Sequence, residues 1–278
     1  MQLQAFAPLV TYPEANTDRV TELVVYFATR IGAKLHAMAI NADIPDVSNA
    51  LSKLLLDTPE LIRQANVESR QRGEHLLALL RSKAAEAKVE MDTAAVAAPI
   101  ALLGDTAAIR ARYFDLNLLG WEAGSEVSRM VAEAVVFGSG KPTILFPATA
   151  DVPAFDHVAI AWDGSRVAAR AVTDARLFLE RAYRVSVITA VDEKPLKDAD
   201  VGERLAEGLR TRGLNAEAVS VMAGDRPIAP TLQEEAKEKG CGLLVMGGYG
   251  HSRLRDFVLG GATEGILADL SMSVLVSH

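Results

Sequence analysis

The sequence predicts an α/β protein with two tandem domains, each built around a parallel sheet. Its 278 residues are enough for two domains of ordinary size. Half of the residues are hydrophobic but only 5% are aromatic, a balance typical of aliphatic helices packed on buried parallel strands. Short apolar runs alternate with stretches of helical period, and this order occurs twice along the chain, which indicates two units of βαβ type.

The first half is expected to begin with a strand, a helix and a second strand, because apolar runs there flank a stretch with apolar residues at helical spacing. An additional segment follows over Asp43–Asp57, and a long helix with Pro59 in its first turn comes next. These four elements are predicted at Leu3–Thr11, Asn16–Ile31, Leu35–Ile40 and Thr58–Ala87.

The second half repeats this order, with a strand, a helix and a strand expected at His157–Trp162, Arg166–Tyr183 and Val185–Val191. Each half then shows a Gly-Asp pair before a helix, an apolar run ending in glycine, and a short final strand. These features lie at Gly104 and Gly224, at Leu116–Gly120 and Leu243–Gly247, and at Pro142–Phe146 and Ser273–Ser277. Residues 147–156 contain two prolines and no periodicity, so the sequence predicts domains at 1–150 and 151–278.

The most informative segment is a glycine-rich loop that follows an apolar strand. Gly247 and Gly250 are separated by two residues, and Gly260 and Gly261 precede a helix predicted from about Glu264. Glycines at the end of a strand let the backbone approach a ligand closely, and the free N–H groups of a helix N-terminus favour an anion. The loop therefore predicts a phosphate site at the carboxyl edge of the sheet.

The G-x2-G-x9-G spacing, followed by a small residue, resembles the ATP-binding signature of the universal stress protein family. The surrounding GGYGHSRLRDFVLGG, the WDGS motif at Asp163, the Val191-Asp192 pair and the Gly224-Asp225 pair extend this resemblance over 155–278. Over 1–150 the resemblance is carried by the order of elements and the FGSGKPTILFP ending. The chain is thus similar to a tandem, two-domain member of that family.

The resemblance implies two Rossmann-like or flavodoxin-like domains, each with a mostly parallel five-stranded sheet. It also implies that ATP or AMP, with or without Mg²⁺, binds in the C-terminal domain, with Asp163 and Val191 near the adenine and ribose. The other binding residues carried over by position are Gly247, Gly250, His251, Gly260, Gly261 and Thr263. The last strands of the family pair, so Thr143–Phe146 would lie beside Val274–Ser277 in an intramolecular pseudo-dimer, with homodimerisation left open.

The chain departs from the family pattern at two places. Gly261 stands where the family has Ser or Thr, so a hydroxyl that would bind phosphate is missing, and Thr263 is the candidate substitute. The first half lacks a glycine loop, and Glu122 and Glu126 stand where phosphate would lie. We therefore expect residues 1–150 to form a degenerate domain of the same type without a phosphate loop.

Several of these residues also have a purely structural interpretation. Asp163 could instead cap the helix that starts near Ser165, His251 could be a solvated loop residue, and Thr263 could serve only as a helix N-terminal residue. Cys241, the only cysteine, is expected to be buried and unreactive. No histidine pair has zinc spacing and no triad pattern occurs, so neither a metal site nor a catalytic residue is assigned.

The sequence therefore predicts a stress-response or regulatory protein that binds ATP or AMP. Two alternatives stay open, a ligand-free protein-interaction module with a vestigial loop and a slow ATPase; no residue stands out as a base, so at most weak hydrolysis is expected. The net charge of −7 is spread over both halves, which argues against nucleic-acid binding. Without a signal peptide, an apolar span or a disulfide, the chain is expected to be cytoplasmic and free of membrane contact.

Overall fold

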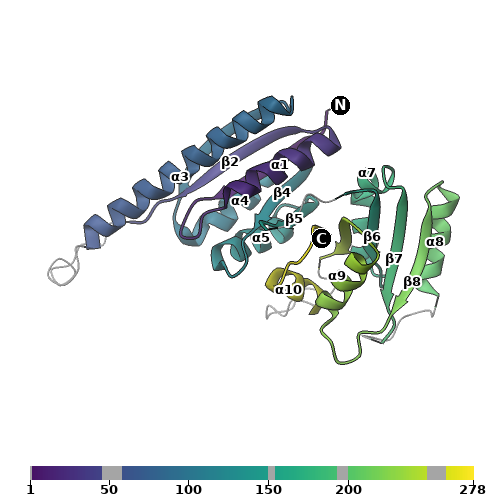
Figure 1. Cartoon of the computed structure of the whole chain (residues 1–278). Coiled ribbons are helices and arrows are strands. Elements are labelled where there is room, and N and C mark those ends of the chain that lie inside the picture. The colour runs from purple at the N-terminus through teal and green to yellow at the C-terminus, as the bar shows by residue number, and fades with distance from the viewer. Residues whose placement is uncertain (1, 46–57, 150–153, 193–199, 249–260) are drawn as a thin grey trace. The chain divides into compact units, whose positions relative to one another are not determined.

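Parallel strands alternate with helices through both halves of the chain, as the repeated sequence pattern predicts (Figure 1). The computed structural model describes residues 2–45, 58–149, 154–192, 200–248 and 261–278. The chain divides into two compact units, Met1–Ser139 and Gly140–His278. The boundary between the two units lies before residues 147–156, which the sequence indicates as the linker. The strand Thr143–Pro147 therefore belongs to the second unit.

The first unit has four parallel strands in the order β3-β2-β1-β4. Its elements in chain order are β1 (Gln4–Val10), α1 (Asp18–Ile31), β2 (Lys34–Ala42), α3 (Thr58–Glu86), β3 (Met91–Ala98), the short 3-10 helix η1 (Ile100–Leu102), α4 (Leu103–Ala111), β4 (Leu116–Trp121) and α5 (Glu126–Gly138). The register places Phe6 of β1 opposite His36 of β2, and His36 opposite Asp92 of β3. The strands and helices expected in this half are confirmed, except that Gly104 and Asp105 lie inside the first turn of α4 and not before it. Residues 46–57 of the expected additional segment lie outside the described residues, and β3 is an addition that the sequence pattern did not indicate.

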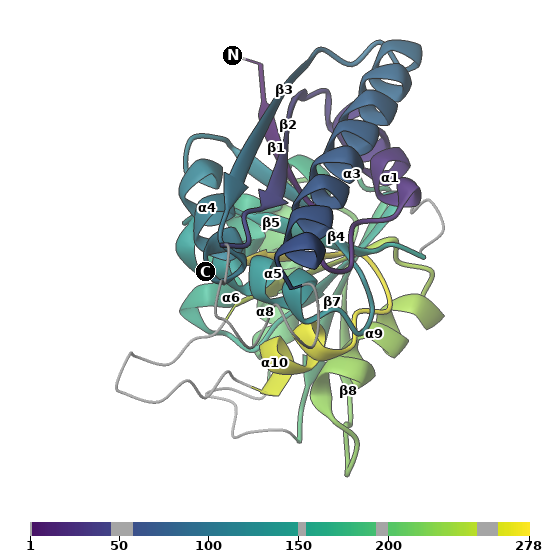
Figure 2. The same cartoon turned by 90° about the vertical axis from the view of Figure 1, so that its left-hand side faces the viewer.

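Helices cover both faces of this sheet. α1 and α3 pack together on one face, with α3 alongside β2, and α4 and α5 pack together on the other (Figures 1 and 2). α1 ends at Gly32, whose left-handed φ of 68° closes the helix. One side of α3 faces inwards, as the helical spacing of its buried residues shows. These residues are Ile62, Ser69, Gly73, Leu76, Leu77, Leu80 and Ala84.

The second unit has strands in the order β5-β10-β9-β6-β7-β8. Its elements in chain order are β5 (Thr143–Pro147), β6 (His157–Ala161), α6 (Arg166–Asp174), α7 (Arg176–Leu179), β7 (Arg184–Ala190), α8 (Val201–Thr211), β8 (Ala216–Val221), α9 (Ile228–Glu238), β9 (Leu243–Gly247), α10 (Gly261–Ala268) and β10 (Val274–Ser277). Five strands, β6 to β10, are parallel, which agrees with the five-stranded expectation. β5 is antiparallel to β10, with Ile144 opposite Leu275, so the expected pairing of these two segments is confirmed.

The sequence predicts one continuous helix over Arg166–Tyr183, and this predicted length is wrong. α6 ends at Asp174, and Ala175, with φ −81° and ψ 0°, joins it to the separate short helix α7. This break directs Phe178 into the interior, where its ring meets the edge of Phe155 at a centroid distance of 5.5 Å. Burial of a second aromatic ring therefore competes successfully with continuation of the helix.

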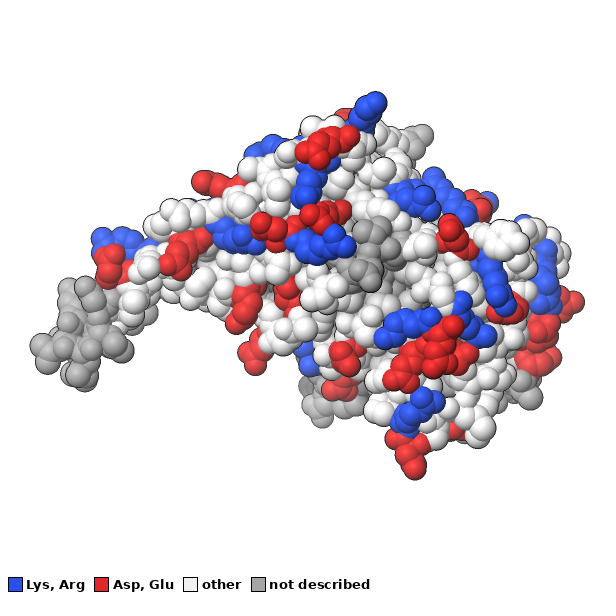
Figure 3. All heavy atoms as spheres, viewed as in Figure 1, with Lys and Arg blue, Asp and Glu red and all other residues white. Residues whose placement is uncertain are grey.

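Aliphatic residues dominate both cores, as the low aromatic content predicts. Positive and negative side chains are intermixed on the face seen in Figure 3, and neither sign dominates a continuous area there. Within the described ranges, no helix combines the length and the apolar character that a membrane span requires.

Candidate functional site

The strand order of the second unit creates a point where the chain connections diverge. β6 and β9 are hydrogen-bonded neighbours, with Ala159 opposite Leu244. β6 continues through α6 to β7 on one side, whereas β9 continues through α10 to β10 on the other. Right-handed crossovers in opposite directions place α6 and α10 on opposite faces of the sheet. Ligands of open α/β sheets bind at such a point, outside the carboxyl ends of the strands, so this edge is the candidate site.

A tight turn follows β6 at this edge. The Asp163 carboxylate accepts a hydrogen bond from the Ser165 main-chain N–H at 2.9 Å, across Gly164, which has a φ of +74°. The Ser165 hydroxyl in turn accepts from the Ala168 N–H at 3.2 Å, so Ser165 is the N-cap of α6. Asp163 therefore shapes the turn that leads into the helix, and the capping role that the sequence left open for Asp163 belongs to Ser165.

An apolar surface and a second structural carboxylate follow β7. Val191 keeps 41% of its surface exposed at the end of this strand. The two oxygens of Asp192 accept hydrogen bonds from the N–H groups of Ala223 and Gly224, each at 2.8 Å. These bonds hold the pKa of Asp192 below its usual range, because they stabilise the charged carboxylate. The end of β7 is thereby tied to the end of β8, and Val191 remains available to a ligand.

The glycine at the end of β9 lies against the start of α6. A Cβ atom at Gly247 would be 2.6 Å from the Ala168 nitrogen, so only glycine fits there. The next N–H group, that of Gly248, donates to the Ser277 carbonyl oxygen at 2.6 Å. The Ser277 hydroxyl is buried and has no hydrogen-bond partner among the described residues. A buried polar group without a partner among the described residues therefore lies at the carboxyl end of β10, on the residue opposite Gly247.

α10 begins at Gly261 and points its N-terminus towards this edge, since a helix after a parallel strand runs back along the sheet. The nearest atom to a Cβ built on Gly261 is 3.8 Å away, so a side chain at this position has room. Thr263, two residues later, is 4% exposed. Asp163, at the end of β6, and Val191, at the end of β7, lie at the same edge of the sheet as Gly261 and Thr263.

Three of the residues expected to bind the ligand, Gly250, His251 and Gly260, lie outside the described residues. The described part of the candidate site consists of Asp163, Val191, Gly247, Gly261 and Thr263. The N-terminus of a helix and an exposed apolar residue at one sheet edge suit a ligand with an anionic end and a flat apolar end.

The corresponding edge of the first unit contains carboxylates of the chain itself. The Glu122 side chain, after β4, accepts a hydrogen bond from the Thr17 N–H at 2.8 Å, just before α1 begins. The Ser125 hydroxyl caps α5 by accepting from the Ser128 N–H and donates to the Glu14 carboxylate at 3.2 Å. Helix N-termini that would attract phosphate are thus bordered by negative side chains in this unit.

The long helix α3 supplies a buried polar residue to the same edge of the first unit. The Ala42 N–H donates to the Ser69 hydroxyl at 2.8 Å, and Ser69 lies 2.7 Å from the Thr11 hydroxyl. Thr11 donates to the Ile40 carbonyl oxygen at 3.0 Å, which completes a chain of hydrogen bonds across β1 and β2. Gly73 of α3 also approaches closely, since a Cβ there would be 2.4 Å from the Asn41 side-chain oxygen. Sequence reasoning missed this role of α3, and no local pattern marks it.

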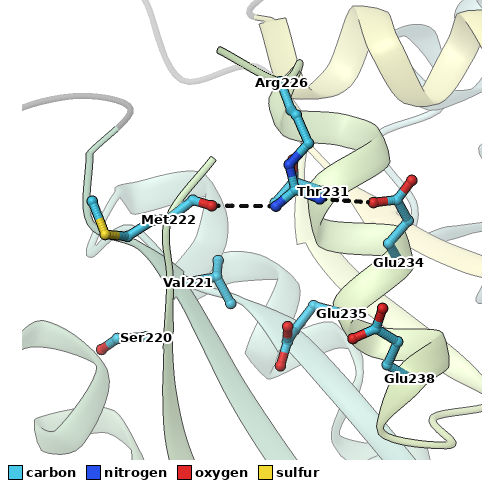
Figure 4. Close-up of a pocket in the computed structure, with 8 residues that line it drawn as sticks. All are labelled: Ser220, Val221, Met222, Arg226, Thr231, Glu234, Glu235 and Glu238. Carbon is cyan, nitrogen blue, oxygen red and sulfur yellow. Dashed lines mark hydrogen bonds and ion pairs between the residues drawn. The ribbon is translucent and has the colours of Figure 1, made fainter. Parts of the chain in front are cut away.

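A shallow hollow of about 180 Å³ lies between β8 and α9 in the second unit (Figure 4). Three of its four charged residues form ion pairs. Arg226 pairs with Glu234 at 3.0 Å and donates to the Met222 carbonyl oxygen, as Figure 4 shows, and Glu235 pairs with Lys239 at 3.7 Å. The remaining charged residue is Glu238, so three carboxylates line the hollow and it does not suit an anionic ligand.

The described residues form neither a metal-binding site nor a reactive thiol. No group of three or more His, Cys, Asp or Glu residues is arranged there to hold a metal ion. Burial raises the pKa of Cys241 to about 12, which keeps the thiol protonated. The expectation that Cys241 is packed into the core is confirmed.

Helices on both faces of a parallel sheet, with the connections diverging at one edge, define a doubly wound α/β protein of Rossmann-like type. Residues 154–278 match the model of the universal stress protein family. This segment therefore contains a universal stress protein domain, as the glycine spacing predicts. Over the whole chain, two units of Rossmann-like α/β fold follow one another.

Solved structures agree with this fold over the full chain. A universal stress protein from Archaeoglobus fulgidus DSM 4304 is 18% identical, with a TM-score of 0.71 over 99% of this chain and 96% of that one. A putative universal stress protein from Pseudomonas aeruginosa UCBPP-PA14 is 15% identical, with a TM-score of 0.55 over 99% and 93% of the two chains. A functionally unknown protein from Pseudomonas aeruginosa PAO1 is 14% identical, with a TM-score of 0.54 over 99% and 92%. No curated protein matches the sequence significantly.

Proposed function

We propose that this protein is a stress-response regulator that binds ATP or AMP at the carboxyl edge of its second unit. The observation that carries this proposal is the divergence point between β6 and β9, where β9 ends in Gly247 and the next helix begins at Gly261. Nucleotides bind at such points because the helix N-terminus offers main-chain N–H groups to the phosphates.

Each part of the nucleotide has a chemically suitable group at this edge. The exposed surface of Val191 suits the flat face of adenine, and the Asp163 carboxylate suits the ribose hydroxyls. The first turn of α10 suits the phosphates, because its main-chain N–H groups and the positive end of the helix dipole favour an anion. Mg²⁺ would be held chiefly by the phosphates, since no group of acidic ligands is arranged for it among the described residues.

Binding is expected in the second unit alone. In the first unit the Glu122 carboxylate already accepts from the Thr17 N–H, and Glu14 lies by Ser125. A phosphate placed there would meet these carboxylates at close range, which is electrostatically unfavourable. The proposal therefore requires one nucleotide per chain.

Isothermal titration of the full chain with ATP plus Mg²⁺, and separately with AMP, tests the proposal. Gly261→Asp places a carboxylate in the first turn of α10, where it favours the helix but repels phosphate, so binding should weaken at least about tenfold. Gly261→Asn has the same shape without the charge and should retain affinity. Gly261→Ser restores the hydroxyl that the family resemblance leads one to expect, and should tighten binding about tenfold to a hundredfold.

Absence of both heat and thermal shift at millimolar nucleotide would contradict the proposal. It would favour the alternative of a ligand-free interaction module, in which Gly247 is retained for its packing against α6. The third possibility, slow ATP hydrolysis, is tested by phosphate release. Release that is unchanged in Gly250→Val would show that this site does not hydrolyse ATP.

A further inference from the structure

A second hollow, of about 390 Å³, opens on the α4 face of the first unit. Its walls come from β1, β2 and β3 and from the C-terminal end of α4. The side chains that matter are Phe6, His36, Asp92, Arg110, Tyr113 and Phe114. Phe6, His36 and Asp92 lie opposite one another near the amino ends of their strands. The hollow is therefore at the amino end of the first unit's sheet, and it shares no residue with the proposed nucleotide site of the second unit.

The floor of the hollow is aromatic and well ordered by its packing. The ring of Phe114 stacks on Phe6, with a centroid distance of 5.0 Å and an interplanar angle of 6°. The His36 ring lies 4.8 Å from the Phe114 ring. Phe6 and Phe114 are buried, so these rings cannot turn away when a ligand enters. Such a floor suits a flat, apolar ligand.

Arg110 is a cation without a carboxylate partner. Its guanidinium lies over the Phe114 ring, 5.7 Å from the centroid, and the residue is exposed. Among the described residues, no hydrogen bond or ion pair engages its side chain. Arg112, two residues further on, donates to the Gly138 carbonyl oxygen at 3.0 Å. Of these two neighbouring arginines, only Arg110 is available to bind an anion at the hollow.

The other charges around the hollow form one ion-pair cluster, in which a single Lys34 meets two carboxylates. Lys34 forms ion pairs with Asp92 at 2.9 Å and with Glu90 at 2.8 Å. Burial lowers the pKa of His36, so its ring is neutral at neutral pH even though it lies 3.4 Å from Asp92. Asp92 is thus already paired with Lys34, whereas Arg110 is the cation lining the hollow for which no ion pair exists among the described residues. Tyr113, 75% exposed, adds an aromatic ring to the wall.

We propose that this hollow is a binding site for a small planar aromatic carboxylate. The ligand's ring packs against Tyr113 and the aromatic floor, and its carboxylate accepts two parallel hydrogen bonds from the Arg110 guanidinium. The volume falls within the range of ordinary small-molecule sites. Arginine is suited to this role, because its planar fork matches a carboxylate and its face can remain on Phe114.

The test uses 2-naphthoate as the probe, titrated into the full chain by isothermal calorimetry. We expect saturable binding with one site per chain. 2-Naphthamide has the same ring without the charge, and cyclohexanecarboxylate has the charge without the aromatic ring; each should bind at least tenfold more weakly. These comparisons need only the wild-type protein, so they remain decisive if a variant fails to fold.

Variants then locate the binding site. Arg110→Gln should weaken binding of 2-naphthoate at least tenfold, whereas Arg112→Gln, the matched change at the same helix end, should leave it unchanged. Equal affinity for 2-naphthoate and 2-naphthamide, no binding of 2-naphthoate, or unaltered binding in a folded Arg110→Gln variant would each overturn the proposal. The proposal would also be overturned if the wild-type protein self-associates and Tyr113→Ala converts it to a monomer. A second copy of the chain would then occupy the hollow.

Discussion

Gly247, the last residue of β9, lies so close to Ala168 of α6 that a Cβ atom at position 247 would be 2.6 Å from the Ala168 nitrogen. The first glycine of the loop is therefore required for packing, whether or not a nucleotide binds. The sequence pattern alone assigns this glycine to the ligand. Stability and binding must consequently be measured separately at this position.

Gly247→Ala should destabilise the second unit by about 1–3 kcal/mol, because the added methyl group meets main-chain atoms that cannot move without shifting α6. Urea unfolding measures the change. Gly208→Ala is the matched control: Gly208 lies in α8, and a Cβ atom added there would have no neighbouring atom within 4 Å. That change should stabilise the helix by about 0.5–1 kcal/mol. Equal effects of the two substitutions would refute the packing role of Gly247.

Asp192→Asn should make the stability of the protein less dependent on acid pH. The folded-state pKa of Asp192 is lowered from an ordinary value of 3.8 by the N–H groups of Gly224 and Ala223. Its stabilising contribution is therefore present above the ordinary pKa and is lost as pH falls through the lower folded value. Urea midpoints of the wild type and variant should differ at about pH 6 and converge towards about pH 3. A difference that is constant with pH, or one equally large in Asp225→Asn, would contradict this assignment.

Cys241 should resist thiol reagents in the native protein, because burial raises its pKa to about 12 and shields the sulfur. The single cysteine makes the result simple to interpret. Reaction with Ellman's reagent at about pH 8 should release almost no thiolate from native protein and one equivalent in urea. Rapid stoichiometric labelling of the native protein would show that the strand it precedes opens readily.

Ser69→Ala should destabilise the first unit by about 1–3 kcal/mol. Its hydroxyl is fully buried and accepts from the Ala42 N–H at 2.8 Å, so its removal leaves a buried donor without a partner. Ser82→Ala, on the exposed side of α3, is the control and should change stability by less than about 0.5 kcal/mol. Chemical denaturation measures both. If the two variants behave alike, the hydrogen-bond chain through Ser69 carries little stability.

Most of the buried strands could be predicted from sequence, because a strand covered on both faces is a nearly continuous apolar run. The bounds predicted for Leu243–Gly247 agree with those of β9. β3 (Met91–Ala98) escaped prediction, since it is an edge strand, consists largely of alanine and leaves much of its surface exposed. The other edge strand, β8 (Ala216–Val221), also escaped, since only its two end residues are buried.

The candidate site was predictable in position and only partly in detail. Glycine spacing and the end of β6 were enough to locate the edge, because the carboxyl ends of parallel strands meet there. The bond from the Ser165 N–H to Asp163 is local, because the two residues are neighbours in one turn. The partners of Asp192 were not predictable, since they are N–H groups about thirty residues away in sequence, near Gly224. Such a bond depends on how distant segments approach one another, which no local pattern in the sequence encodes.

A crystal structure of the full chain grown with ATP and Mg²⁺ tests nucleotide binding most directly. We expect one nucleotide per chain, with its phosphates at the first turn of α10 near Gly261 and its adenine against Val191. Density for a nucleotide at the β1–β4 edge of the first unit, or a second-unit edge closed by the chain's own side chains, would contradict the proposed function.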